Sequence, residues 1–339
     1  MRWLFALALA SSLAHAQQLE LHFIDVGQGD AVLIRSPSGQ NVLYDGGRPA
    51  TVVLDYLESV GVSSLDLVIA SHPDADHIGG LQAVVEAYRP QFYLDDDIVA
   101  ETDVYQELTT SVRALGVAEL EPTARRVGLG AASLQVIPPP GDERLGRNNN
   151  SVGVVVTYGD FRAALTGDAE EAEFDWWLGN VPELLGPVQV YKSSHHGSTN
   201  GDTLRSVTTF GPEAIVISVG EGNTYGHPEP ETLALYQSIS ADIYRTDQSG
   251  TVVVSATADG NYTVDAQPSA EPEVIPTEPL EADPEQTTAF DPFGEDKDCG
   301  DFGSQAEAQA FYEAAGGPGE DPHRLDGDGN GAACDGPSY

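Results

Sequence analysis

The densest group of metal-binding side chains lies in residues 71–80, Ser-His-Pro-Asp-Ala-Asp-His-Ile-Gly-Gly. Two imidazoles and two carboxylates fall within six residues, at His72, Asp74, Asp76 and His77. A tight turn there can aim the first two at one metal ion and the last two at a second ion nearby. Imidazole suits zinc, manganese or iron, and carboxylates favour harder ions. Because a bound ion lowers the pKa of its water toward about 7, the pattern predicts metal-assisted hydrolysis.

The elements around this motif alternate between strands and helices. A buried strand is expected over residues 65–70, directly before the motif, and a helix over residues 78–88 after it. The same patterns predict strands over residues 19–26, 31–35, 41–44, 133–137, 152–158, 161–166, 188–191, 214–219, 243–245 and 251–255, and helices over residues 51–60, 170–178 and 231–238. Polar residues cluster where the strands end, which is where α/β folds place their chemistry. The sequence therefore predicts one α/β domain over residues 17–266.

Several separate motifs resemble those of the metallo-β-lactamase superfamily. Residues 72–80, H-x-D-x-D-H-x-G-G, are similar to its central motif, which normally has a histidine in the second ligand position. The variant with aspartate resembles one branch, the soluble domain of the DNA-uptake competence protein ComEC and its stand-alone relatives. Further motifs of this branch match residues 25–30, 165–168, 193–198 and 225–228. The resemblance implies a four-layer αββα sandwich of two mixed sheets, with the metals at one edge.

The resemblance also assigns roles to residues outside the central motif. Asp168 matches the aspartate that bridges both metals and, with Asp76, is expected to be catalytic. Asp45 matches an acidic residue that braces the metal loop, and Asp30 lies in a motif expected to support the site. The late histidine ligand corresponds to one of two neighbours, His195 or His196. The first of these after the strand, His195, is favoured.

One departure from the superfamily concerns the first metal. No histidine stands between the central motif and the bridging aspartate, and residues 148–151, Asn-Asn-Asn-Ser, occupy its place. That metal would then be held mainly by His72, Asp74 and Asp168. Asn150 either adds an oxygen or, in the same loop as Ser151, hydrogen-bonds a phosphate. Because an oxygen-rich set is less selective, one or two divalent metals are expected, Zn²⁺ or Mn²⁺, with Mg²⁺ a further candidate.

Two other residues near these motifs have open roles. Lys192 is the only lysine before the C-terminal tail, and it either meets a phosphate or is structural. His227, which precedes Pro228, is a metal ligand, a substrate contact or a loop histidine.

The charge of the chain limits its partners. Fifteen basic residues face 54 acidic ones, for a formal net charge of −39. This field repels nucleic acid and anionic membranes over roughly 8 Å at physiological salt, and it disfavours sequence-independent binding of long polymers. An anionic substrate is still allowed, because bound dications reverse the local sign. Adaptation of the surface to salt is an equally open explanation of the acidity.

The mechanism that these residues imply is attack by a metal-activated hydroxide, hydrogen-bonded to Asp76 or Asp168, on a phosphorus or carbonyl centre. The competence-branch motifs favour a phosphodiesterase or nuclease acting on short or single-stranded nucleic acid. The alternative is a hydrolase of lactones, esters or β-lactams, which would need an apolar pocket over the metals. A non-catalytic, calcium-dependent binding protein is a third hypothesis.

The N-terminal residues have the pattern of a signal peptide over residues 1–16. Arg2 precedes the apolar residues 3–10, and residues 14–16 form an Ala-His-Ala cleavage site. This predicts a secreted protein, extracellular or periplasmic. The apolar run is too short to span a bilayer, and no later run is long enough, so no integral membrane span is expected.

The C-terminal part differs in composition from the rest. Residues 267–295 are rich in Pro, Glu, Asp and Thr and are expected to form an acidic linker. Residues 296–339 contain the first half of an EF-hand-type calcium loop, with these ligand candidates: Asp326, Asp328, Asn330, Ala332 and Asp335. The only two cysteines, Cys299 and Cys334, flank the loop and should pair in an oxidising compartment.

This module resembles the excalibur domain, an extracellular calcium-binding module. The resemblance leaves its role open among anchoring, calcium-dependent stabilisation and contact with a cell envelope.

Overall fold

The computed structural model describes residues 18–48 and 50–266, and six residues further on: Ala308, Phe311, Tyr312, Leu325, Ala333 and Cys334. The chain forms two compact units, Met1–Ala270 and Glu271–Tyr339. The expected signal peptide, the linker, Cys299 and the calcium-loop residues Asp326, Asp328, Asn330, Ala332 and Asp335 lie outside the described residues. Among the described helices, none combines the length and the hydropathy needed to cross a membrane.

The first unit is built on two sheets. One contains β1 (Leu19–Phe23), β2 (Val32–Arg35), β3 (Asn41–Tyr44), β4 (Leu67–Ile69), β5 (Phe92–Leu94), β6 (Ala118–Leu120), β14 (Val252–Ala256) and β15 (Tyr262–Asp265). The other contains β7 (Arg125–Leu129), β8 (Ala132–Ile137), β9 (Gly153–Tyr158), β10 (Phe161–Leu165), β11 (Val190–Lys192), β12 (Ala214–Ile217) and β13 (Asp242–Arg245). Their strand orders are β15-β14-β1-β2-β3-β4-β5-β6 and β13-β12-β11-β10-β9-β8-β7.

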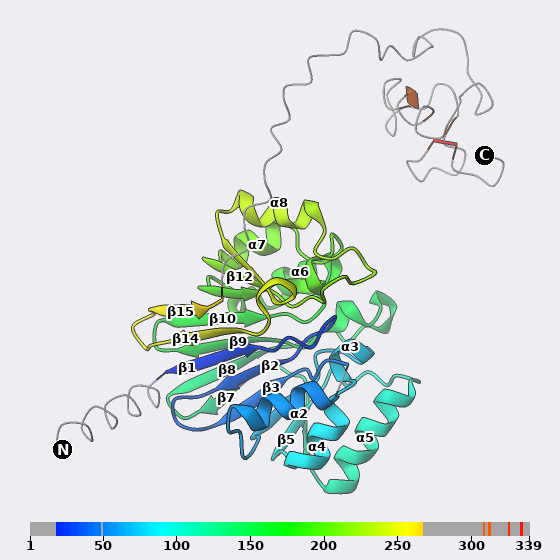
Figure 1. The fold of residues 1–339 in the computed structure, drawn as a ribbon. Helices are drawn as coiled ribbons and strands as arrows, with labels where there is room; N and C mark the ends of the chain where they lie inside the picture. Colours follow the sequence, from blue (N-terminus) through cyan, green and yellow to red (C-terminus); the bar gives the residue numbers. More distant parts are fainter. Residues whose placement is uncertain are drawn as a thin grey trace. The chain divides into compact units, whose positions relative to one another are not determined.

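Helices cover the outer face of each sheet (Figure 1). The longer ones are α2 (Ala50–Ser59), α4 (Leu81–Tyr88) and α5 (Asp103–Leu115) on the first sheet, and α6 (Glu171–Asn180), α7 (Leu204–Phe210) and α8 (Pro230–Ser238) on the second. Shorter elements are α3 (Ala75–Ile78), α9 (Thr246–Ser249), η1 (Glu143–Leu145), η2 (Asn148–Asn150), η3 (Pro182–Leu184) and η4 (Ser194–Gly197). One apolar core fills the space between the sheets, and one lies under each helical layer. This is a mixed α/β fold, as the sequence patterns predict, and it has the four layers that the motif resemblance implies.

The strand directions bring the motif residues to one edge. In the first sheet β3 and β4 are parallel, and in the second β10, β11 and β12 are parallel. The residues that follow these strands include Asp45, His72, Asp168 and His196. Since the carboxyl ends of parallel strands share an edge, residues far apart in sequence meet there.

In the second unit, the six described residues are buried together in one apolar cluster. Cys334 is 6% exposed and is not a free cysteine, and its backbone N–H donates to Leu325 O at 2.8 Å. Its pairing with Cys299 stays a prediction, because Cys299 is not described.

Candidate metal centre

Asp45 fixes the loop that carries the central motif. Its backbone is left-handed, with φ 59°, and its side chain is fully buried. Oδ1 accepts a hydrogen bond from the Ser71 backbone N–H at 2.7 Å, and Oδ2 accepts one from Ser71 Oγ at 2.7 Å. The same Oδ2 lies 2.9 Å from Nδ1 of His77. One carboxylate therefore sets both the path of the loop and the orientation of an imidazole.

Three buried imidazoles are each held through Nδ1. His72 Nδ1 lies 3.0 Å from Ser71 Oγ, and His196 Nδ1 lies 2.9 Å from the backbone oxygen of Ser218. His77 Nδ1 is likewise held by Asp45, so in all three rings the nitrogen left for another partner is Nε2. Each Nε2 is buried and has no hydrogen-bond partner among the described residues. An imidazole held at one nitrogen with the other one free is the arrangement of histidine metal ligands.

The free nitrogens converge on Asp168. Its Oδ2 lies 3.2 Å from His77 Nε2 and 3.4 Å from His196 Nε2, and its Oδ1 is buried without a hydrogen-bond partner. Donor atoms held tetrahedrally by one ion at about 2.0–2.2 Å are themselves roughly 3.3–3.6 Å apart. The observed spacing therefore fits a bound divalent metal, with Asp168 placed between two ligand groups.

The two remaining carboxylates of the central motif lie next to these imidazoles. Asp76 Oδ2 lies 3.5 Å from His196 Nε2, and Asp74 Oδ2 lies 3.6 Å from His72 Nε2. Ligand atoms within 4.8 Å of one another form the sets His72–His77–Asp168 and Asp76–His77–His196, among others. These sets fit one metal near His72, His77 and Asp168 and a second near Asp76, His77 and His196, with Asp168 also beside His196. Asp74 lies next to His72 at the edge of the first group but belongs to none of the sets.

Electrostatics tie these residues into one network. Burial alone would lower the pKa of His196, but Asp168 and Asp30 raise it to about 9. In the same way, Asp168 and Asp45 raise the pKa of His77 well above its usual value against the effect of burial. Burial would raise the pKa of Asp168, but His196 and His77 hold it well below its usual value. The carboxylate is therefore kept ionised and ready to bind a cation.

The structure favours His196 over His195 as the late histidine ligand, contrary to the sequence-based preference. Both have left-handed backbones, with φ 54° and 47°, so their side chains leave the turn in different directions. His195 Nε2 lies 3.9 Å from Asp168 Oδ2, and its Nδ1 lies 3.3 Å from Glu170 Oε1. Its side chain is 18% exposed against 2% for His196, so His195 lies at the rim of the centre.

The suggested oxygen ligand Asn150 is turned away from the metals. Its amide donates to the backbone oxygens of Asp142 and Gly146 at 3.0 and 2.7 Å and accepts from the Asp142 N–H at 3.0 Å. It is fully buried, so it holds its own loop rather than a metal or a phosphate. Ser151, also fully buried, accepts from the Asp168 N–H at 3.2 Å and so supports the bridging residue.

Lys192 is structural and cannot meet a substrate phosphate, because it is fully buried. Its ammonium group forms an ion pair with Asp30 and donates to the Gly167 backbone oxygen at 3.0 Å. The Asp30 N–H in turn donates to Asp76 O at 3.1 Å. A Cβ on the preceding residue, Gly29, would lie 2.2 Å from that same oxygen, so only glycine allows this approach. Asp30 and Lys192 therefore support the metal loop through its backbone, at Asp76.

His227 lies beside the centre but belongs to neither ligand set. Its ring centroid is 5.7 Å from that of His195 and 6.5 Å from that of His196, nearly parallel to the latter at 28°. Burial, reinforced by these two neighbours, lowers its pKa. This placement favours a role facing the substrate over that of a ligand.

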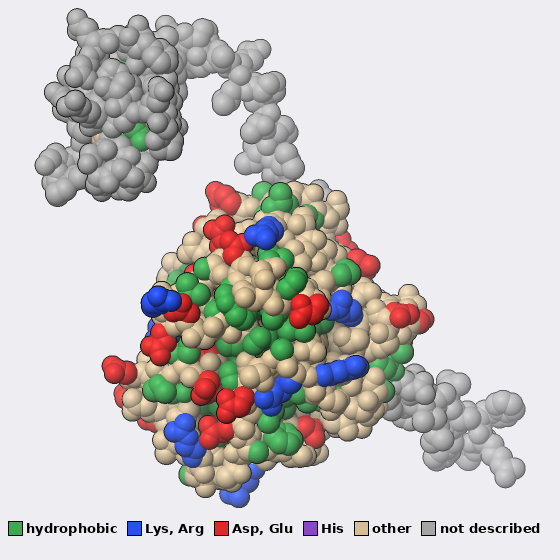
Figure 2. Space-filling model, turned by 180° about the vertical axis from the view of Figure 1, so that it is seen from behind, with side chains coloured by type: hydrophobic (Ala, Val, Ile, Leu, Met, Phe, Trp, Pro, Cys, Tyr) green, Lys and Arg blue, Asp and Glu red, His purple; other side chains and the backbone are tan. Residues whose placement is uncertain are grey.

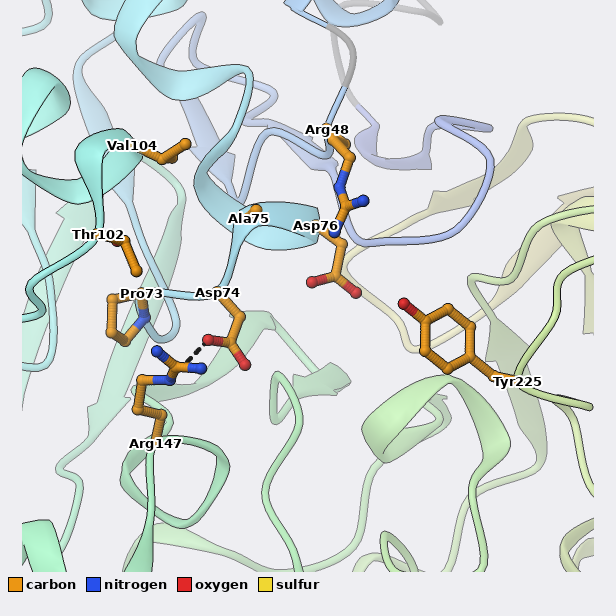
Figure 3. Close-up of a pocket in the computed structure, with 9 residues that line it drawn as sticks. All are labelled: Arg48, Pro73, Asp74, Ala75, Asp76, Thr102, Val104, Arg147 and Tyr225. Carbon is orange, nitrogen blue, oxygen red and sulfur yellow. Dashed lines mark ion pairs between the residues drawn. The ribbon is translucent and has the colours of Figure 1, made fainter.

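A pocket of about 320 Å³ opens beside Asp74 and Asp76 (Figure 3). It is lined by Arg48, Pro73, Asp74, Ala75, Asp76, Thr102, Val104, Arg147 and Tyr225. The sequence motifs assign no role to the two arginines, and Tyr225 enters them only as the first residue of the motif at residues 225–228. A signal was present, since in a chain poor in basic residues Arg48 follows the Asp45 motif and Arg147 directly precedes the asparagine run.

The two-sheet fold and this centre define the class of metal-dependent hydrolases. Residues 24–219 match the metallo-beta-lactamase superfamily model, which is more than half of the chain. The chain therefore belongs to the metallo-beta-lactamase superfamily.

Curated relatives are found among competence proteins. The chain is 28% identical over 255 residues to ComE operon protein 3 of Bacillus subtilis (strain 168), covering 69% of this chain and 32% of the relative. It is 27% identical over 236 residues to competence protein ComA of Neisseria gonorrhoeae, covering 67% of this chain and 30% of that relative. The chain thus spans about a third of the length of these relatives. Among solved structures, the metallo-beta-lactamase fold protein YhfI of Bacillus subtilis matches with a TM-score of 0.46 at 14% identity, covering 73% of this chain and 99% of that one.

Proposed function

We propose that this protein is a metal-dependent phosphodiesterase that hydrolyses nucleic acid in short or single-stranded form. The observation that carries the proposal is the pair of arginines in the pocket beside Asp74 and Asp76. A guanidinium group matches the geometry of a phosphate. The alternative substrates, lactones, esters and β-lactams, would favour an enclosed apolar pocket over the metals, whereas four of the nine residues that line this pocket are charged, two arginines and two aspartates.

The restriction to short or single-stranded substrates follows from charge. The chain carries a formal charge of −39, which opposes the counterion-release binding of long nucleic acid. On the face shown in Figure 2, basic side chains lie scattered among acidic ones rather than gathered into a groove. The competence names of the relatives agree with a DNA-related substrate.

The chain's own residues divide the chemical work. His72, Asp74, Asp76, His77, Asp168 and His196 would hold one or two divalent metals, Zn²⁺ or Mn²⁺ being favoured and Mg²⁺ a further candidate. Such ions supply Lewis-acid activation of water and of the phosphoryl group. Asp168 and Asp76, whose pKa values are lowered by the neighbouring histidines, are ionised and can accept hydrogen bonds that orient the attacking water.

The test uses metal-free protein with Mn²⁺, Zn²⁺ or Mg²⁺ added back, assayed on single-stranded DNA, duplex DNA and bis-p-nitrophenyl phosphate. We expect metal-dependent cleavage that is lost in Asp76→Asn and retained in Asp160→Asn, a matched change at an exposed residue. Absence of cleavage with metal bound, as measured by elemental analysis, would overturn the proposal and favour lactone or ester substrates.

We further propose that the protein is exported and that residues 296–339 form an excalibur-like calcium module closed by a Cys299–Cys334 disulfide. The N-terminal pattern, the calcium-loop spacing and the buried cluster around Phe311 and Cys334 support this. Calcium titration of the oxidised protein should raise its melting temperature, and Asp326→Asn should abolish the rise. If calcium did not raise the melting temperature of the unmodified protein, the calcium module would be contradicted. If the protein stayed inside the cells that produce it, export would be contradicted.

A further inference from the structure

The pocket beside the metal centre is the size of one small group. Its volume of about 320 Å³ is at the lower end of the range for ligand sites. It opens directly onto Asp74 and Asp76, which we assign to the metals (Figure 3). A polymer cannot enter it, but a single nucleotide unit can, with the rest of the chain outside.

The cations of the pocket are largely unused. Arg147 Nε lies 2.7 Å from Asp74 Oδ1, while its side chain is 49% exposed, so its terminal N–H groups remain open to a ligand. Arg48 is exposed and, within the described residues, has no ion-pair partner. In a chain with 15 basic and 54 acidic residues, an unpaired arginine facing a carboxylate-lined metal centre is poorly explained as a structural residue. A phosphate group bound beside the metals would explain its position.

The third residue, Tyr225, offers an aromatic surface at the same pocket. It is 61% exposed, and its phenol points across the pocket toward Asp76 (Figure 3). Its ring packs nearly parallel to that of His227, with centroids 5.7 Å apart and planes at 24°. The loop is braced by Asn223, whose Oδ1 accepts from the backbone N–H groups of Tyr225 and His227, each at 3.1 Å. An exposed aromatic ring held by such a loop is a preorganised stacking surface rather than a misplaced core residue.

Together, Arg48, Arg147 and Tyr225 indicate which part of a substrate would bind in the pocket. We propose that Arg48 and Arg147 bind the phosphate of a nucleotide whose unpaired base stacks on Tyr225, an assignment that rests on the phosphodiesterase activity proposed above. A base inside a duplex has no free face, so stacking on Tyr225 selects single-stranded segments or chain ends. Tyr225, His227 and His196 lie one against the next in nearly parallel pairs, which connects the stacking surface to the metal centre.

The test compares two diesters with the same leaving group, p-nitrophenyl thymidine 5′-phosphate and methyl p-nitrophenyl phosphate. They share the reacting phosphate and differ in the nucleoside, so the ratio of their kcat/KM values measures base recognition. We expect the full chain, loaded with Mn²⁺, to prefer the thymidine diester. Tyr225→Ala should reduce that preference by about tenfold or more, mainly through KM, whereas Tyr225→Trp should retain it.

Replacement of Arg48 tests phosphate binding independently of base stacking. Because both diesters carry the phosphate, Arg48→Gln should lower kcat/KM for both by about tenfold and leave their ratio unchanged. Arg126→Gln and Leu204→Ala, matched changes at exposed residues elsewhere, should alter neither value. Cleavage of both diesters with a ratio unaffected by Tyr225→Ala would overturn base stacking and leave the proposed activity standing. Cleavage of neither diester by metal-loaded protein would overturn the activity itself, and this assignment with it.

Discussion

Asp45 Oδ2 lies 2.9 Å from His77 Nδ1, and the same carboxylate accepts two hydrogen bonds from Ser71. Neither contact involves a metal, yet together they determine where His77 Nε2 points. Asp45 therefore orients a metal ligand without being assigned as one. Its replacement tests whether the geometry of the centre matters when all the assigned ligands are kept.

The first prediction concerns this support. Asp45→Asn keeps the size of the side chain, and asparagine also tolerates the left-handed backbone at this residue. The amide cannot accept on both sides as a carboxylate does, so we expect metal affinity to fall by about 10- to 100-fold. Calorimetric titration with Zn²⁺ or Mn²⁺ measures this, with Asp160→Asn as the control. Unchanged affinity in Asp45→Asn would mean that the loop holds its shape without the carboxylate.

The second prediction separates the two late histidines. His196→Asn should remove one nitrogen ligand and lower the metal content of the purified protein by up to one equivalent, since its Nε2 lies 3.4 Å from Asp168 Oδ2. His195→Asn should leave the content unchanged, because its ring lies at the rim of the centre and its Nε2 is 3.9 Å from Asp168 Oδ2. Elemental analysis after gel filtration gives the stoichiometry. Loss of metal in His195→Asn alone would reverse the assignment.

The sequence could not decide between these histidines for a geometric reason. The sequence predicts a strand over residues 188–191, and β11 (Val190–Lys192) does end just before the turn. The direction of each ring, however, depends on two consecutive left-handed residues. No alternation rule extends through such a turn. By contrast, Asp45, His72 and Asp168 follow regular parallel strands, whose ends bring them together by topology alone.

The helix expected over residues 78–88 shows a second limit. The structure has two helices there, α3 (Ala75–Ile78) and α4 (Leu81–Tyr88). Gly79 and Gly80 separate them, and a Cβ on Gly80 would lie 2.2 Å from the backbone oxygen of Gly46. The break thus depends on a contact with a distant segment, which local periodicity does not report. The other expected helices and the expected strands overlap elements of the structure because their alternation reflects burial on a sheet or under it. The sequence patterns did not predict the helices α5 and α7 or the strands β5, β6, β7 and β15.

The third prediction concerns the buried ion pair of Lys192 with Asp30. In β11 Val190 faces the core between the sheets and Tyr191 the outer core, so Lys192 faces inward again. Lys192→Met would remove the ammonium group paired with the buried Asp30 and leave only the more distant imidazoles of His77 and His196 beside it. We expect the free energy of unfolding to fall by about 3–5 kcal/mol. Urea unfolding of the metal-free protein measures this.

A double variant supplies the control for that experiment. Lys192→Met combined with Asp30→Asn removes both charges, so it should recover part of the lost stability. If the single variant were as stable as the unmodified protein, the pair would be dispensable, and a binding role for Lys192 would have to be reconsidered despite its burial.

The fourth prediction is the pH dependence contributed by Asp96, which lies after β5 (Phe92–Leu94). Burial, reinforced by the charges of Asp95 and Asp97, raises the pKa of Asp96 to about 8, and its Oδ2 has no hydrogen-bond partner among the described residues. The folded state therefore binds this proton more tightly than the unfolded state. The stability that the proton contributes is fully present below about pH 4 and is lost as the pH rises toward 8, at up to about 1.4 kcal/mol per pH unit. Asp96→Asn has no such proton to lose, so its unfolding free energy relative to the unmodified protein should increase between pH 5 and pH 7.5. Urea unfolding at these two pH values, with Asp160→Asn as control, measures the difference, and a constant offset between Asp96→Asn and the unmodified protein would show that Asp96 is already ionised at pH 5.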